Sequence, residues 1–152
     1  MTSPDSAPRS ACSYPIVIIE HTLRGGLYGL LAGAVMASGP SKLVKIAKTT
    51  VLGAGWCYLA EYSRCAINEM LPWTSESSQT AWVPGAIAGF VSGSTVATAY
   101  RPFLPPAQVA AFTAFSTMTY AMNSYAEWLS QYESYQKSKE HHHAFHGAPE
   151  RG

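Results

Sequence analysis

The sequence predicts an all-α membrane protein with four transmembrane helices and glycine-rich GxxxG packing in helices one and three. Three observations support this fold class. Four stretches of the chain lack Asp, Glu, Lys and Arg, prolines and polar loops separate these stretches, and small residues recur at every fourth position in the first and third of them. Charged residues make up only 12% of the chain, about half of the ~25% that is typical of soluble domains.

The uncharged stretches cover residues 25–41, 49–60, 77–100 and 102–126. A helix that crosses the hydrocarbon core of a bilayer needs ~20 mostly apolar residues, and three of the stretches reach or approach that length. The second is shorter and requires the lysines at its start to extend toward the headgroups. The mean hydropathy of the whole chain, +0.01, argues against the membrane interpretation because it is low for such a protein.

Prolines and glycines set the expected element boundaries. An irregular N-terminal segment over 1–17 precedes a four-helix transmembrane domain over 18–139, and 140–152 form a disordered tail. Ser41 is the expected N-cap of the second helix, and Pro84 is tolerated in the first turn of the third. The expected helices cover 18–37, 41–69, 82 or 84–100, and 106–139.

Two stripes of small residues are the most informative feature. They comprise Gly25, Gly29, Gly33 and Ala37 in the first helix, and Gly85, Gly89, Gly93 and Ala97 in the third. In a water-exposed helix each glycine would cost ~1 kcal/mol relative to alanine, so the stripes indicate close helix–helix contact. They could line a translocation path or a partner groove, but packing within the same bundle is the favoured interpretation. Their matching register also suggests an internal two-helix repeat.

Basic residues cluster at the two short turns, with Lys42, Lys45 and Lys48 at the first and Arg101 at the second. Because Lys and Arg accumulate in loops on the inner side of a membrane, these turns are expected to face the cytoplasm or matrix and both termini the opposite side. The three lysines are candidates for binding an anionic headgroup such as that of cardiolipin. Topology marking by lysines that reach the interface is the simpler explanation.

Further candidate contacts lie near the ends of the second and fourth helices. Arg64 and Glu61 are spaced for an i,i+3 pair, which either contacts a neighbouring subunit or lies at a helix end. Trp128 belongs to an aromatic face that is either a docking surface or an aromatic belt at the headgroup level. The other members of this face are Tyr125, Tyr132 and Tyr135.

The cysteines and histidines predict no metal site. Cys12, Cys57 and Cys65 lack zinc-ligand spacing, and Cys57 and Cys65 lie roughly 12 Å apart along one expected helix, too far to pair. A bridge from Cys12 to either of them is possible, with free thiols favoured. The histidines 141–143 and 146 lie in the expected tail, where no preorganised ligand shell is predicted.

Catalytic motifs are lacking in the sequence, which has no GxSxG, HExxH or P-loop motif. Gly53-Ala54-Gly55 lacks the strand and the third glycine of a dinucleotide site. The net charge of +1 gives no basic field for nucleic acid. We therefore expect no enzyme activity, no catalytic or cofactor-binding residues, no metal and no nucleic-acid partner.

The arrangement resembles the mitochondrial inner-membrane translocase (Tim-type) family. Arg64 near the end of the second helix, followed by the run Ala88-Gly89-Phe90-Val91-Ser92-Gly93, is similar to the signature of that family. Asn68 stands where the signature has an acidic residue, and the spacer between the two parts is longer than usual. Within the family, residues 43–125 resemble an accessory subunit of respiratory complex I. Three features carry this resemblance: the apolar second helix, Cys57 shortly before Arg64, and the stretch 82–89.

This resemblance implies a non-catalytic accessory subunit of complex I (NADH:ubiquinone oxidoreductase) that packs against the membrane arm, with membrane-arm subunits and phospholipids as partners. It implies the mitochondrial inner membrane, with termini in the intermembrane space, and a disulfide between Cys12 and Cys57. The alternative function is a subunit of a protein translocase or solute channel of the same family. The scarcity of charges within the expected helices favours the accessory role over an aqueous path.

Overall fold

The computed structural model of the protein describes residues 15–99 and 105–146. The elements are α1 (Pro15–Met36), α2 (Lys42–Met70), the short 3-10 helix η2 (Pro72–Ser75), α3 (Val83–Ala99) and α4 (Pro106–His146). The described residues contain no strand. The all-α prediction is therefore confirmed, and the four helices occupy the four expected regions.

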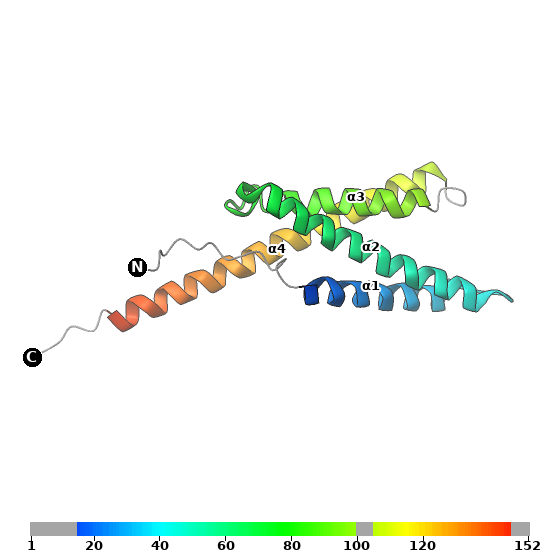
Figure 1. The fold of residues 1–152 in the computed structure, drawn as a ribbon, viewed down its shortest axis with the longest axis horizontal. Coiled ribbons are helices and arrows are strands. Elements are labelled where there is room, and N and C mark those ends of the chain that lie inside the picture. The colour runs from blue at the N-terminus through cyan, green and yellow to red at the C-terminus, as the bar shows by residue number, and fades with distance from the viewer. Residues whose placement is uncertain (1–14, 100–104, 147–152) are drawn as a thin grey trace, which may run out of the picture.

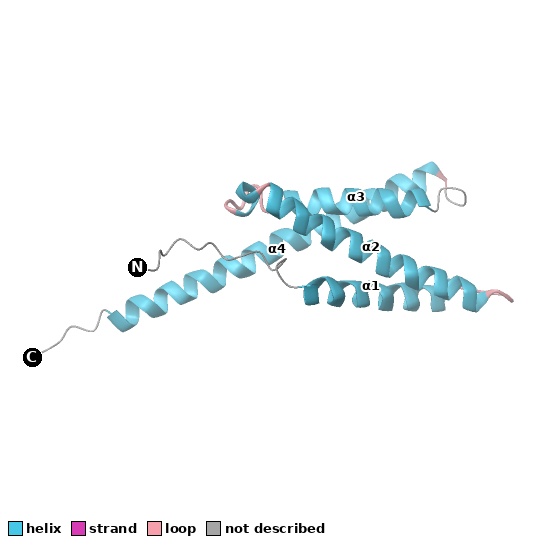
Figure 2. Ribbon diagram, in the orientation of Figure 1, coloured by secondary structure: helices cyan, strands magenta, loops and turns pink. Residues whose placement is uncertain are grey.

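The helices form two hairpins, α1 with α2 and α3 with α4, joined by contacts between α2 and α3. In Figure 1, α2 runs obliquely between α1 and α3, and the C-terminal half of α4 extends beyond the rest of the bundle. Figure 2 shows how short the α1–α2 turn is, and places η2 beside the loop that leads into α3. The helix α1 packs mainly on α2, which leaves the side of α1 that faces α3 and α4 largely uncovered.

The first hairpin is held together by direct contact between backbones. A Cβ atom built on Gly25 would collide with the carbonyl oxygen of Gly53, and one built on Gly29 would collide with the carbonyl oxygen of Thr49. A Cβ on Gly33 would meet the Thr49 hydroxyl. These contacts are possible only because the three positions carry no side chain, and all three glycines are buried.

The second hairpin repeats this arrangement. A Cβ on Gly85 would collide with the carbonyl oxygen of Tyr120, and one on Gly89 with that of Ser116. At Gly93 the nearest atom would be the Ser116 Cβ, at 2.6 Å. In both hairpins, therefore, the glycine stripe of the first helix receives the backbone of the second helix. The stripes serve packing within the bundle, and the two hairpins share the same mode of contact.

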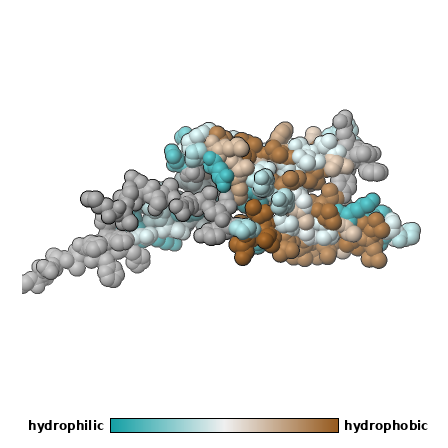
Figure 3. Space-filling view, viewed as in Figure 1, coloured by the Kyte–Doolittle hydropathy of each residue, from teal (hydrophilic) through white to brown (hydrophobic). Residues whose placement is uncertain are grey.

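The interior is made of small and polar side chains, and the large apolar side chains point outward. The buried hydrophobic residues are Ala60, Cys65, Ala81, Ala88, Ala97 and Tyr120. Many leucine, isoleucine, valine, methionine and aromatic side chains are exposed instead. Figure 3 shows the resulting apolar surface over the α1–α2 hairpin and over α3.

The prediction of transmembrane helices is wrong. None of the helices within the described residues combines the length and the apolar character that crossing a bilayer requires. The helix α3 has 17 residues, fewer than the ~20 needed. The longer α2 and α4 carry charged and polar residues along their length, and α1 includes Glu20, His21 and Arg24. The predicted multi-pass topology depends on such helices and is therefore also wrong. The mitochondrial location stays a prediction.

Two local expectations also need correction. The helix α4 continues to His146, so residues 140–146 belong to a helix and not to a disordered tail. An uninterrupted run of helix-compatible residues from Ser130 onward, without proline or glycine until Gly147, explains this extension. Ser41 does occupy the N-cap position of α2, but its side chain makes no capping hydrogen bond.

Candidate functional site

A cluster of charged side chains, two of them buried and one half-exposed, connects α2 to α4. Arg64 is 7% exposed and Glu61 is 2% exposed. The Arg64 guanidinium donates to the Glu61 carboxylate one turn earlier on α2 and to the Glu127 carboxylate on α4. The predicted Arg64–Glu61 pair is thus present, but it lies in the interior, and its third member comes from the other hairpin.

Burial and pairing act in opposite directions on the arginine. Removal from water alone would lower the pKa of Arg64, because it disfavours the charged form. The hydrogen bond and the charge of Glu61, together with the charge of Glu127, outweigh burial and raise the pKa of Arg64 above its ordinary value. The guanidinium therefore stays protonated, and its two carboxylate partners keep it compensated in the interior.

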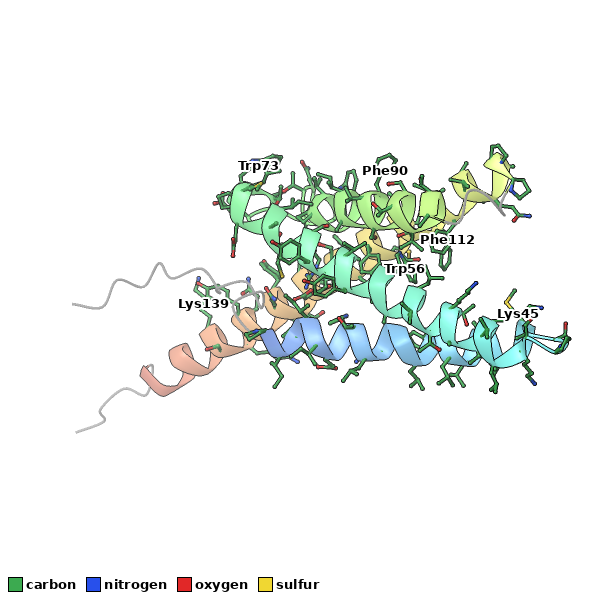
Figure 4. All side chains as sticks on the ribbon, turned by 45° about the vertical axis from the view of Figure 1, so that its right-hand side comes forward. Lys45, Trp56, Trp73, Phe90, Phe112 and Lys139 are labelled. Carbon is green, nitrogen blue, oxygen red and sulfur yellow. The ribbon has the colours of Figure 1, made fainter. Side chains whose placement is uncertain are left out.

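A second connection between the hairpins centres on Trp56. The indole N–H of Trp56 donates to the Ser116 hydroxyl at 2.8 Å, and that hydroxyl donates to the Gly89 carbonyl at 2.7 Å. The indole ring also packs against Phe112 and, edge to face, against Tyr120. Figure 4 shows Trp56 on α2 and Phe112 on α4 next to each other where the two helices cross. One indole therefore joins α2, α3 and α4.

The Cys57 thiol and the Tyr120 hydroxyl interact with each other next to this tryptophan. Burial raises the pKa of the Cys57 thiol, although the hydrogen bond from Tyr120 opposes the shift. Burial also raises the pKa of the Tyr120 hydroxyl, and the hydrogen bond with Cys57 adds to that effect. Both groups are thus held neutral. A neutral thiol is a poor nucleophile, so this pair stabilises the helix crossing and offers no reactive sulfur.

The raised pKa values of these two groups predict that the protein loses stability in alkaline solution. Above pH 9.0 the unfolded chain releases the Cys57 proton, and above pH 10.0 the Tyr120 proton, while the folded protein retains both. The folded state then binds more protons than the unfolded state, so the free energy of unfolding falls as pH rises. Denaturant titrations between about pH 8 and pH 11 measure this slope. The double variant Cys57→Ala/Tyr120→Phe should show a clearly smaller slope; an unchanged slope would contradict the assignment.

The predicted disulfide between Cys12 and Cys57 is not formed. Cys57 is a free cysteine in the structure, whereas Cys65 is disulfide-bonded. Cys12 lies outside the described residues. The Cys57 thiol is half-buried and lies near Gly25 of α1.

The two cysteines of α2 should therefore differ in labelling. Denaturation without reductant is expected to expose the Cys57 thiol to iodoacetamide while Cys65 stays unlabelled. Peptide mass spectrometry identifies the labelled residue. Prior reduction should make both cysteines of α2 reactive, which serves as the positive control. Labelling of Cys65 before reduction would contradict the assignment.

The other predicted contact residues lie on α2 and α4, the three lysines at the start of α2 and Trp128 directly after Glu127 on α4. Lys42, Lys45 and Lys48 are exposed on the first turns of α2, and the Lys45 ammonium donates to the Ser38 carbonyl at 3.0 Å. Trp128 stacks between Tyr125 and Tyr132, with ring centroids 6.2 and 5.3 Å away. These aromatic rings form one continuous stack on α4. Figure 4 shows Lys45 at the opposite end of the molecule from Lys139, which lies further along α4.

Sequence reasoning did not identify Trp56, Ser116, Ser124 or Glu127. Ser124 donates to the Ala81 carbonyl at 2.8 Å, and so fastens α4 to the loop that leads into α3. One available signal was the eight-residue spacing of the two serines, which matches the spacing of Gly85 and Gly93 on the facing helix. Groups of three or more His, Cys, Asp or Glu side chains placed to hold a metal are not found in the part of the chain that the structure describes.

Comparison with known proteins gives no relative to guide the interpretation. The chain matches no protein-family model, no curated protein and no solved structure.

Proposed function

We propose that the protein is a non-catalytic accessory subunit of a larger assembly, and that this assembly is respiratory complex I. The observation that carries the structural role is the distribution of side chains. Glycine, alanine and serine fill the contacts between the helices, while large apolar side chains cover the outside of both hairpins. Extended apolar surfaces of this kind mark sites of interaction, and a packing subunit needs such a surface.

One face of α1 illustrates this point. Leu23, Leu27 and Leu31 are exposed and follow one another at four-residue spacing, so their side chains form one ridge on the helix. The opposite face of α1 carries the glycines that contact α2. The helix is therefore fixed to α2 by one face and presents leucines on another. Such a ridge suits contact with a subunit of complementary apolar surface.

The choice of complex I rests on the resemblance of residues 43–125 to accessory subunits of that complex. The Arg64–Glu61–Glu127 cluster supports a structural role for Arg64, the residue that carries much of that resemblance. Both terminal nitrogens of its guanidinium donate to carboxylates within the chain. This arrangement favours a rigid packing unit over a subunit that lines a charged path.

Native gel separation of mitochondrial extracts, followed by mass spectrometry, tests the proposal. A tagged copy of the chain should migrate with the NADH-oxidising band of about a megadalton. The triple variant Leu23→Ser/Leu27→Ser/Leu31→Ser should be lost from that band, since it removes the ridge without touching the glycine contacts. The matched variant with methionine at the same positions keeps the apolar surface and should remain. Migration with protein-import intermediates, or only as a free chain, would overturn the proposal.

A further inference from the structure

An apolar groove opens along α2, on the side where α1 does not reach α3 and α4. It has a volume of about 530 Å³, and Trp56, Leu52, Phe112 and Gly29 are among its lining residues. The groove results from the way the hairpins are arranged. The helix α1 is held to α2 by its glycines, and α4 is held to α3, so none of the described helices closes the space between α1 and the second hairpin.

A second apolar hollow, of about 450 Å³, adjoins this groove. Val44, Val51 and Ala99 contribute to its lining. Leu52 lines both hollows, so the two hollows border the same side chain of α2. The two hollows are therefore separate apolar spaces on either side of Leu52. The volume of each lies within the range of about 300–1,000 Å³ that is usual for a ligand site.

Positive charge lies beside both hollows. Lys48 lines the second hollow and lies one turn before Leu52 on the same face of α2. Lys45 lies one turn before Thr49, which lines the first groove. None of the salt bridges within the described residues involves these lysines.

The walls of the site contain no opposing charge. Between Glu20 and Glu61 the sequence has no acidic residue, and neither α3 nor the part of α4 before Glu127 contains one. The Lys45 ammonium uses one of its three donors on the Ser38 carbonyl. The lysines thus combine uncompensated positive charge with direct access to two apolar hollows, which is the complement of an anionic amphiphile with two hydrocarbon chains.

We propose that this site binds an anionic phospholipid, with one acyl chain in each hollow and the phosphate between Lys45 and Lys48. The two hollows select a lipid with two chains over a fatty acid with one. The lysines select a negatively charged headgroup over a zwitterionic one. This inference concerns the isolated chain and does not depend on the complex I proposal, so each can fail without the other.

Quenching of tryptophan fluorescence by a brominated lipid tests the site, because Trp56 lines the groove. The probe is phosphatidylglycerol with dibrominated acyl chains, added to the full-length protein in detergent micelles. We expect saturable quenching that the Trp56→Phe variant largely loses, although Trp73, Trp82 and Trp128 remain. Brominated phosphatidylcholine should quench more weakly, and inorganic phosphate should not compete. Equal quenching by the two lipids, or full quenching of Trp56→Phe, would overturn the proposal.

Two sets of variants test separately the lysines that bind the headgroup and the groove that binds an acyl chain. At about 1 kcal/mol for each lysine, Lys45→Gln/Lys48→Gln should weaken binding of phosphatidylglycerol about 30-fold. Lys137→Gln/Lys139→Gln removes the same charge from α4 and should have little effect. Ala32→Phe, at an exposed position that lines the groove, should block quenching of Trp56, whereas Ala34→Phe should not. Circular dichroism verifies that each variant folds. Folded variants that all bind as the parent does would place the lipid elsewhere and refute the assignment.

Discussion

Replacement of Arg64 by methionine is expected to lower the free energy of unfolding by about 3–5 kcal/mol. The substitution keeps much of the apolar volume but leaves the Glu61 carboxylate, which is 2% exposed, without its positive partner. A buried charge without a partner is far more costly than a missing pair. Urea denaturation followed by circular dichroism measures the loss. The chain should also become more sensitive to protease at the α2–α4 crossing, because Arg64 is the ionic contact between these helices.

Two further variants distinguish this explanation from a general effect of removing an arginine. Arg24→Met breaks the Arg24–Glu20 pair, whose side chains are 54% and 65% exposed, and should cost at most about 1 kcal/mol. Adding Glu61→Leu to Arg64→Met removes both buried charges and should recover most of the lost stability. A double variant as unstable as Arg64→Met alone would show that packing, and not the unpaired carboxylate, sets the cost.

The local part of this cluster could be predicted from the sequence, and its long-range part could not. Glu61 and Arg64 are three residues apart on an expected helix, so their pairing follows from helix geometry. Glu127 lies 63 residues after Arg64. Its position relative to Arg64 depends on the axial register of α4 against α3 and on how α3 packs on α2. Neither quantity follows from the periodicity of a single helix.

The features of the sequence that predicted the four helices correctly did not justify the prediction that these helices cross a membrane. Uncharged stretches and small-residue stripes indicate close helix packing, which the glycine contacts bear out. Lack of charge is not the same as strong hydropathy, however. In α3, glycine, serine, threonine and alanine account for most of the helix, and these residues permit close contact while contributing little apolar area. The same composition thus gave the right packing and the wrong membrane prediction.

Substitution of Gly89 by alanine is expected to destabilise the protein by about 1–3 kcal/mol, although alanine is the better helix former. The added Cβ would collide with the Ser116 carbonyl oxygen and would lie 2.8 Å from the Ser116 carbonyl carbon. These are backbone atoms of α4, so a side-chain rotation cannot relieve the collision and the whole helix must move. That movement would also break the hydrogen bond from Ser116 to the Gly89 carbonyl.

Gly55 provides the matched control, since a Cβ at this position in α2 has no heavy atom within 4 Å. Gly55→Ala should therefore stabilise the protein by about 0.5–1 kcal/mol, because only the helix propensity changes. The same chemical change is thus expected to have opposite signs at the two positions. Thermal denaturation of both variants beside the parent protein measures the difference. A stabilising Gly89→Ala would mean that α3 and α4 do not approach as closely as their glycine stripe permits, and the packing of the second hairpin would have to be revised.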